Sequence, residues 1–182
     1  MRAPKEAAFD FSFYAPYKAA VETAFLSLCA ARMQLEEEHT PFAVRSMTFR
    51  LKSPASIREK LLRRGLLLRL TERAGSLPQN AQGAASLHDV AGLRVVLSSV
   101  EAVYHFADIL RASTAWQFVC ARDYIAAPKK SGYRGLHLVM LVPVCLNGQN
   151  ASVPVEIQLR TPAMDMWACV EHDLCYKPVK EA

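Results

Sequence analysis

The residues whose types and spacing are best suited to catalysis are two carboxylates, Asp89 and Glu156. In residues 153–160 apolar side chains alternate with Glu156, Gln158 and Arg160, so the spacing predicts a strand that carries a polar row on one face. Asp89 stands just before a second apolar segment. Magnesium in proteins takes one or two carboxylates, and substrate phosphates and water complete its shell. Two separated carboxylates near basic side chains therefore point to metal-assisted phosphoryl transfer.

A polar row of this kind also has a simpler interpretation. By pattern alone it is more typical of an ordinary edge strand with one face in water. A basic loop favours the catalytic interpretation, because its cations would surround the two carboxylates. The cations of this loop are Arg122, Lys129, Lys130 and Arg134.

The net charge of +5 is concentrated in one part of the chain. Residues 45–73 hold nine basic and two acidic side chains. Residues 1–44 carry four basic and six acidic ones, and the remainder is balanced at nine against nine. A cationic patch on an otherwise balanced protein favours a polyanionic ligand, either nucleotide phosphates or nucleic acid. The simpler alternative is a solvated helix face.

Part of this patch forms a cationic corner. Arg50 and Lys52 are two residues apart on a predicted strand, so they share a face at a spacing of about 7 Å. Ser56 and Lys60 are one turn apart on a helix predicted to begin after Ser53. The free N–H groups of a helix N-terminus suit phosphate, which makes this corner a candidate phosphate site.

Several function classes are disfavoured. The sequence contains no GxxxxGK[ST], GxGxxG, GxSxG or HExxH motif, which argues against P-loop, dinucleotide-binding, serine hydrolase and zinc protease sites. The five cysteines form no CxxC pair and fit a reducing cytoplasm. The apolar stretch 136–146 is too short to span a bilayer, and the charges within residues 1–11 do not fit a signal peptide. We therefore expect a cytoplasmic protein without a membrane partner.

Hydrophobic periodicity predicts one domain over residues 1–182 in which helices interleave with strands. The predicted strands are 46–52, 92–98, 116–121, 136–146 and 153–160, the last two joined by a hairpin at Asn147-Gly148. The predicted helices are 14–38, 53–65, 98–111, opened by a Ser98–Glu101 capping box, and 161–176. A stripe on the last helix is predicted to face the core and consists of Met166, Trp167, Val170 and Leu174. These elements predict an α/β (α+β) fold with a mixed sheet flanked by helices.

Four segments resemble the synthetase domain of RelA/SpoT-type alarmone synthetases, in the order of that family. They read FRLKSPASIREKLLRRG, HDVAGLRVV, RDYIAAPKKSGYRGLH and VEIQLRTPAMDMWACVEHDLCYK. The resemblance covers about residues 45–177, the expected catalytic core. Within this family the chain resembles the small single-domain synthetases. It implies a nucleotidyltransferase-like fold and a GTP pyrophosphokinase of the stringent response. Such an enzyme transfers pyrophosphate from ATP to the 3′-hydroxyl of GDP or GTP and forms (p)ppGpp and AMP.

The resemblance also assigns roles on the donor side. It implies that Arg50 and Arg94 stack on the two sides of adenine, which planar guanidiniums do well. It implies an ATP phosphate site built from Lys52, Ser56, Lys60 and Arg122. Asp89 would coordinate Mg²⁺, and Glu156 would either share the metal or accept the proton of the 3′-hydroxyl. The implied catalytic set is Asp89, Glu156, Arg50 and Lys52.

On the acceptor side the resemblance implies a guanine site. Tyr133 would stack on the base, and Lys129 and His137 would lie near the 5′ phosphates. Gln158 and Asp165 would line the same pocket.

Two other functions remain open at this point. A toxin-like relative would pyrophosphorylate adenine nucleotides or tRNA 3′ ends, and a non-catalytic module would only bind RNA. A homo-oligomer is possible, and RNA is a possible partner beside ATP and GDP or GTP.

Overall fold

The computed structural model describes residues 14–37, 44–53, 56–57, 59 and 88–176. The predicted loop 75–86 and most of the predicted helix 53–65 lie outside these residues. The helices are α1 (Tyr14–Glu37), α4 (Val100–Ala112) and α5 (Pro162–Tyr176). The strands are β1 (Val44–Leu51), β2 (Ala91–Leu97), β3 (Gln117–Asp123), β4 (Leu136–Leu146) and β5 (Gln149–Arg160).

The five strands form one mixed sheet in the order β1-β2-β5-β4-β3. β2 and β5 run parallel, and the other neighbouring pairs are antiparallel. β5 therefore lies at the centre of the sheet, with β2 on one side and β4 on the other. The alternative of a solvated edge strand for residues 153–160 is wrong, because this strand is paired along both of its edges.

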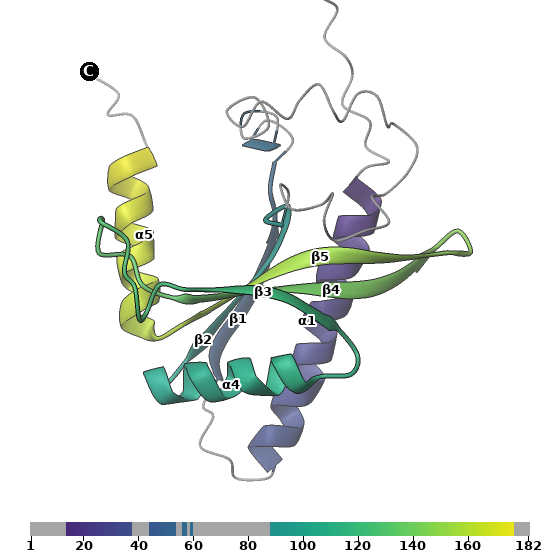
Figure 1. The fold of residues 1–182 in the computed structure, drawn as a ribbon, viewed down its shortest axis with the longest axis horizontal. Coiled ribbons are helices and arrows are strands. Elements are labelled where there is room, and N and C mark those ends of the chain that lie inside the picture. Colours follow the sequence, from purple (N-terminus) through teal and green to yellow (C-terminus); the bar gives the residue numbers. More distant parts are fainter. Residues whose placement is uncertain (1–13, 38–43, 54–55, 58, 60–87, 177–182) are drawn as a thin grey trace, which may run out of the picture.

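One face of the sheet is apolar and is covered by two helices. On β5 the inward side chains of this face are Val153, Val155, Ile157 and Leu159, all fully buried. Val21 of α1 and Phe106 of α4 join the same cluster, so both helices pack on this face. Figure 1 shows α5 apart from α1 and α4, at the end of the sheet where β5 ends. The opposite face of the sheet is thus left for polar side chains, and the α+β prediction is confirmed.

The hairpin between β4 and β5 forms where the sequence predicts it. Asn147 and Gly148 both have positive φ angles, 51° and 77°, which is the backbone of a two-residue hairpin turn. Pairing starts directly after this turn, with Leu146 opposite Gln149. For that reason β5 begins at Gln149, four residues before the predicted start.

The stripe predicted to face the core on α5 is exposed instead. Met166, Trp167 and Val170 are 67%, 46% and 43% exposed, whereas Met164 and Ala168, one turn apart, are buried. α5 covers only one end of the sheet, so only a narrow face of this helix is buried. The side chain of Leu174 lies outside the residues described.

The start of α4 differs by one residue from the predicted capping box. The N-cap is Ser99, whose side-chain oxygen accepts a hydrogen bond from the Ala102 N–H at 3.1 Å. β2 runs to Leu97, and Ser99 keeps an extended backbone, so the helix cannot begin until Val100.

This difference gives a direct test of the fold. Ser99→Ala should lower the free energy of unfolding by about 1 kcal/mol, because an N–H of the first turn loses its acceptor. The matched variant Ser98→Ala should change it by no more than about 0.5 kcal/mol, as expected for an exposed surface position. Urea unfolding of the three proteins measures both values. A larger loss of unfolding free energy for Ser98→Ala than for Ser99→Ala would contradict the observed cap.

Candidate active site

The polar row of the central strand forms the floor of the candidate site. Glu156, Gln158 and Arg160 are 8%, 7% and 4% exposed and lie on the face opposite the hydrophobic core. His137 of β4 lies directly opposite Gln158 and is also buried. A buried polar row in the middle of a sheet is retained only if its members satisfy one another.

Glu156 is held by contacts with two neighbouring side chains. Its Oε1 lies 3.1 Å from His137 Nδ1, and its Oε2 accepts a hydrogen bond from Gln158 Nε2 at 2.8 Å. Burial alone would raise the pKa of Glu156, and the Asp89 charge raises it further. The hydrogen bonds and the interaction with His137 outweigh these effects and lower its pKa below the ordinary 4.5. Glu156 is therefore an ionised, buried carboxylate at neutral pH.

His137 connects Glu156 to Tyr133. Arg160 donates from Nη2 to the Tyr133 hydroxyl oxygen at 2.8 Å. That hydroxyl lies 2.6 Å from His137 Nε2, and His137 Nδ1 lies 3.1 Å from Glu156 Oε1. The buried polar groups of Arg160, Tyr133, His137 and Glu156 thus form one continuous network.

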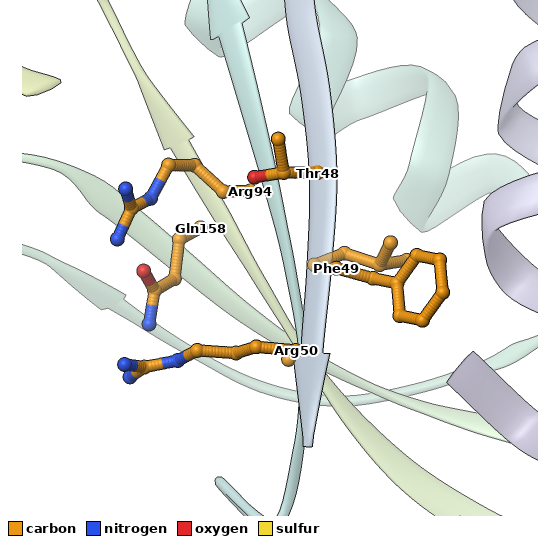
Figure 2. A pocket seen from close by; sticks show the side chains of 7 residues that line it. Thr48, Phe49, Arg50, Arg94 and Gln158 are labelled. Carbon is orange, nitrogen blue, oxygen red and sulfur yellow. The ribbon is translucent and has the colours of Figure 1, made fainter. Parts of the chain in front are cut away.

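A shallow pocket lies beside this floor over β1 and β2. Figure 2 shows Arg50, Arg94 and Gln158 pointing to one side of the sheet, while Phe49 points to the other. Gly92 is paired with Arg50 across the strands, and a Cβ at Gly92 would lie 3.8 Å from Arg50 Cγ. Two planar guanidiniums thus flank one opening, as expected for the stacking of a flat base.

The described residues include part of the predicted cationic corner. Ser53 caps the following turn, since its side chain accepts a hydrogen bond from the Ser56 N–H at 3.2 Å. Lys52 Nζ forms an ion pair with Asp89 Oδ2 at 3.0 Å. Lys60 lies outside the residues described. Lys52, Ser56 and Asp89 are thereby placed at the end of β1, next to the floor of the site.

The acceptor-side loop, residues 124–135, encloses Tyr133 more tightly than a stacking role requires. The Tyr133 ring is only 5% exposed, and burial raises the pKa of its hydroxyl. Lys129 Nζ lies over the ring, 4.4 Å from its centroid, and Tyr124 packs edge-on against it. A base can therefore stack on Tyr133 only after Lys129 moves. Arg122, which the resemblance assigns to the ATP phosphate site, lies exposed on β3 opposite His137, at the other edge of the sheet from β1.

Asp165 and Arg160 make more contacts within the site than the sequence indicates. One oxygen of Asp165, Oδ1, lies 2.9 Å from Arg160 Nη1 and 3.3 Å from Arg94 Nη1. Arg160 was visible in the sequence as part of the polar row, but nothing there gave it a role. The signal that identifies it is its burial together with three hydrogen-bonded partners: Tyr133, Gln158 and Asp165.

The carboxylates fit a metal ion that also needs substrate phosphates. Within the described part of the chain, no group of three or more His, Cys, Asp or Glu is placed to hold a metal. Asp89 and Glu156 influence each other electrostatically, which agrees with two carboxylates beside one site. Magnesium is bound in this way, by one or two carboxylates with phosphates and water.

Comparison with known proteins agrees with this geometry. A family described as a region found in RelA and SpoT proteins matches residues 49–181. The chain is 35% identical to GTP pyrophosphokinase YwaC of Bacillus subtilis, over 87% of this chain and 69% of that protein. It is 37% identical to GTP pyrophosphokinase YjbM of the same species, over 91% of this chain and 72% of that protein.

Solved structures give the same result. The small alarmone synthetase 1 from Bacillus subtilis, bound to its product pppGpp, superposes with a TM-score of 0.77 at 38% identity. The match covers 91% of this chain and 80% of that one. A GTP pyrophosphokinase family protein from Streptococcus pneumoniae has a TM-score of 0.77 at 35% identity, over 91% and 75%.

The fold and site thus define a nucleotide-binding α+β domain with a buried carboxylate between two cationic regions. The family match extends over most of the sequence, and the relatives exceed 30% identity over more than two thirds of their own length. The chain belongs to the RelA/SpoT family, which confirms the resemblance. Among the described helices, none has the length and apolar character needed to cross a bilayer.

A charge effect can be tested at the start of the acceptor-side loop. Asp123 Oδ1 accepts hydrogen bonds from the N–H groups of Ile125 and Ala126, and Oδ2 accepts one from the Tyr104 hydroxyl. Burial raises the Asp123 pKa, but these bonds and Arg111 outweigh burial and lower it below the ordinary 3.8. A lowered pKa means that the charge stabilises the fold above pH 3.8. This contribution is lost as the pH falls through the folded-state pKa.

Asp123→Asn should therefore be less stable than the unmodified protein at pH 7, and the difference should shrink below pH 3.8. Urea unfolding between pH 7 and pH 3 measures it. Asp108→Asn is the control, because Asp108 is 72% exposed in an ion pair with Arg111 and should cost about 0.5 kcal/mol or less. A difference for Asp123→Asn that stays constant with pH would contradict the charge effect.

Proposed function

We propose that this chain is a GTP pyrophosphokinase that transfers the β,γ-pyrophosphoryl group of ATP to the 3′-hydroxyl of GDP or GTP. The products are (p)ppGpp and AMP. The observation that carries the proposal is the ionised Glu156 at the centre of the polar face, between the Arg50–Arg94 pocket and the Lys129–Tyr133 loop. The family and the named activities of the relatives support the same reaction.

The donor nucleotide binds over β1 and β2. Adenine stacks between Arg50 and Arg94, and the phosphates extend toward Lys52 and Ser56 at the end of β1. The resemblance assigns Lys60 and Arg122 to the same phosphate site, and Arg122 would reach it from β3, at the opposite edge of the sheet. Binding of three linked phosphates at these positions directs the β-phosphorus toward the floor of the sheet, where Glu156 lies.

Nucleotide pyrophosphokinases generally use a divalent metal ion, and we propose Mg²⁺ here. When bound, the ion neutralises charge on the transferred phosphates. Asp89 would hold the ion, because its carboxylate is partly exposed beside the phosphate site. Lys52, which pairs with Asp89, would then leave it and contact the phosphates instead.

Glu156 acts as the general base. The acceptor's 3′-oxygen attacks the β-phosphorus, its proton passes to Glu156, and the bond from the β-phosphorus to the α–β bridging oxygen breaks to release AMP. Both carboxylate oxygens already accept one hydrogen bond, from His137 and Gln158, and each retains a lone pair. These bonds fix the carboxylate in place, so positioning supplies part of the rate enhancement.

The acceptor binds on the β4 side of the floor. Guanine stacks on Tyr133 once Lys129 leaves the ring face, and Lys129 and His137 then contact the 5′ phosphates. Gln158 and Asp165 line the same pocket. The cytoplasmic location, the single-domain organisation, and an RNA partner or homo-oligomer remain predictions from the sequence.

The first test removes the base without changing its shape. Glu156→Gln should lower kcat by about 100- to 10,000-fold, because the amide cannot accept the proton. The measurement is transfer of γ-labelled phosphate from ATP, offered separately with GMP, GDP, GTP, ATP and deacylated tRNA. The matched control Glu101→Gln, on α4, should keep the activity of the unmodified protein.

The acceptor that receives the label decides between the related functions. Label on GDP or GTP supports the proposal, and label only on tRNA or adenine nucleotides contradicts it in favour of a toxin-like relative. No transfer to any acceptor by the unmodified protein would contradict an enzymatic function altogether. Activity of Glu156→Gln equal to that of the unmodified protein would contradict the role of Glu156.

A second test addresses Lys129. Lys129→Met should raise KM for GDP by about tenfold or more, which corresponds to the loss of one charge-assisted bond to a phosphate. KM for ATP should change by less than about twofold, since Lys129 lies on the acceptor side. Lys130→Met is the matched control, because that neighbour is exposed and should act only by general attraction. Equal effects of the two variants would contradict a specific contact by Lys129.

A further inference from the structure

Arg160 is a buried charge for which the proposed reaction has no direct use. Its side chain is 5% exposed, and no step described above brings it into contact with either nucleotide. Its Nη2 donates to the Tyr133 hydroxyl at 2.8 Å and to Gln158 Oε1 at 3.0 Å, and its Nη1 donates to Asp165 Oδ1 at 2.9 Å. Three partners from three different segments are thus held by one planar group.

Stability alone does not favour this arrangement. Among the described residues Arg160 Nε has no hydrogen-bond partner, although the atom is buried. Replacing a buried ion pair by apolar side chains of similar volume is often neutral or stabilising. A buried guanidinium that is incompletely bonded therefore indicates a function of the contacts it makes.

The carboxylate of Asp165 extends these contacts to the donor side. The same oxygen that accepts from Arg160 also lies 3.3 Å from Arg94 Nη1. Arg94 belongs to the pocket of β1 and β2, whereas Tyr133 belongs to the acceptor-side loop. A continuous series of short polar contacts thus joins the two halves of the site: Arg94, Asp165, Arg160 and Tyr133.

We propose that Arg160 is a positioning residue which, through the shared carboxylate of Asp165, makes acceptor binding depend on occupation of the donor pocket. The inference rests on the proposed function. A base stacked on Arg94 restrains that side chain and with it Asp165. Restraint of Asp165 orders the guanidinium of Arg160, which in turn orders Tyr133 and Gln158. The acceptor then binds a site whose side chains have already lost their freedom, and so it binds more tightly.

The coupling is measured as a ratio of two dissociation constants. The Kd of GDP is determined by calorimetry with Mg²⁺, in the absence and in the presence of saturating α,β-methylene ATP, which cannot be cleaved at the reacting bond. Couplings of this kind typically amount to about 5- to 150-fold. We expect the analogue to lower the Kd of GDP by at least about fivefold in the unmodified protein, within this range.

Two variants interrupt the series at different points. Arg160→Met removes the buried charge at nearly constant volume, and Asp165→Asn keeps the shape but removes the charge shared with Arg94. In each variant the ratio of the two dissociation constants should fall below about twofold. The double variant should show no further loss, because both substitutions break the same contact between Arg160 and Asp165. General damage to the fold would raise both dissociation constants of GDP, with and without the analogue, and would leave their ratio unchanged.

The matched controls are Arg111→Met and Asp108→Asn, which break an exposed ion pair on α4 with the same two residue types. Both should keep the ratio of the unmodified protein. A ratio near one in the unmodified protein, or a ratio unchanged in both Arg160→Met and Asp165→Asn, would overturn the inference. If such a protein still forms (p)ppGpp in the label-transfer assay, the proposed function stands and only the coupling fails. Absence of transfer to every acceptor would overturn the function itself.

Discussion

The rest of the site depends on one constraint, the burial of opposite charges on the central strand of the sheet. Glu156 and Arg160 are four residues apart on β5, and the amide of Gln158 lies between them. This amide donates from Nε2 to the carboxylate and accepts at Oε1 from the guanidinium, so its orientation is fixed by its two neighbours. Reversal of the amide would place oxygen against oxygen and nitrogen against nitrogen. The charges are thus compensated without direct contact between them.

The same strand also supplies the hydrophobic core, because successive side chains point to opposite faces. Ile157 and Leu159 are fully buried against α1 and α4, while Glu156 and Gln158 form the floor of the site. A shift of the register by one residue would exchange the two sets. Packing of the core therefore fixes the position of the polar row, and the two neighbouring strands fix what faces it: Gly92 on β2 and His137 on β4.

Local patterns predicted most of the strands and the hairpin, because alternation and the Asn147-Gly148 turn act over a few residues. The order of the strands depends on pairing between distant segments, and this order places the polar row on a central strand, where it is buried, and not on an edge strand. The prediction that Trp167 faces the core was wrong for a related reason, because helical periodicity does not show how much of a helix the sheet will cover. The importance of Arg160 likewise appears only when Tyr133 and Asp165 are brought to it. The roles of the site residues came from the resemblance and not from the pattern.

Two lysines occupy corresponding positions on the two sides of the floor. Lys52 is paired with the Asp89 carboxylate, and Lys129 lies over the Tyr133 ring. In the proposed reaction each lysine would exchange this partner for a phosphate, Asp89 would hold the metal ion, and the guanine base would stack on Tyr133. The site therefore holds one lysine against a carboxylate and the other against an aromatic ring, and in the proposed reaction substrate binding rearranges these contacts.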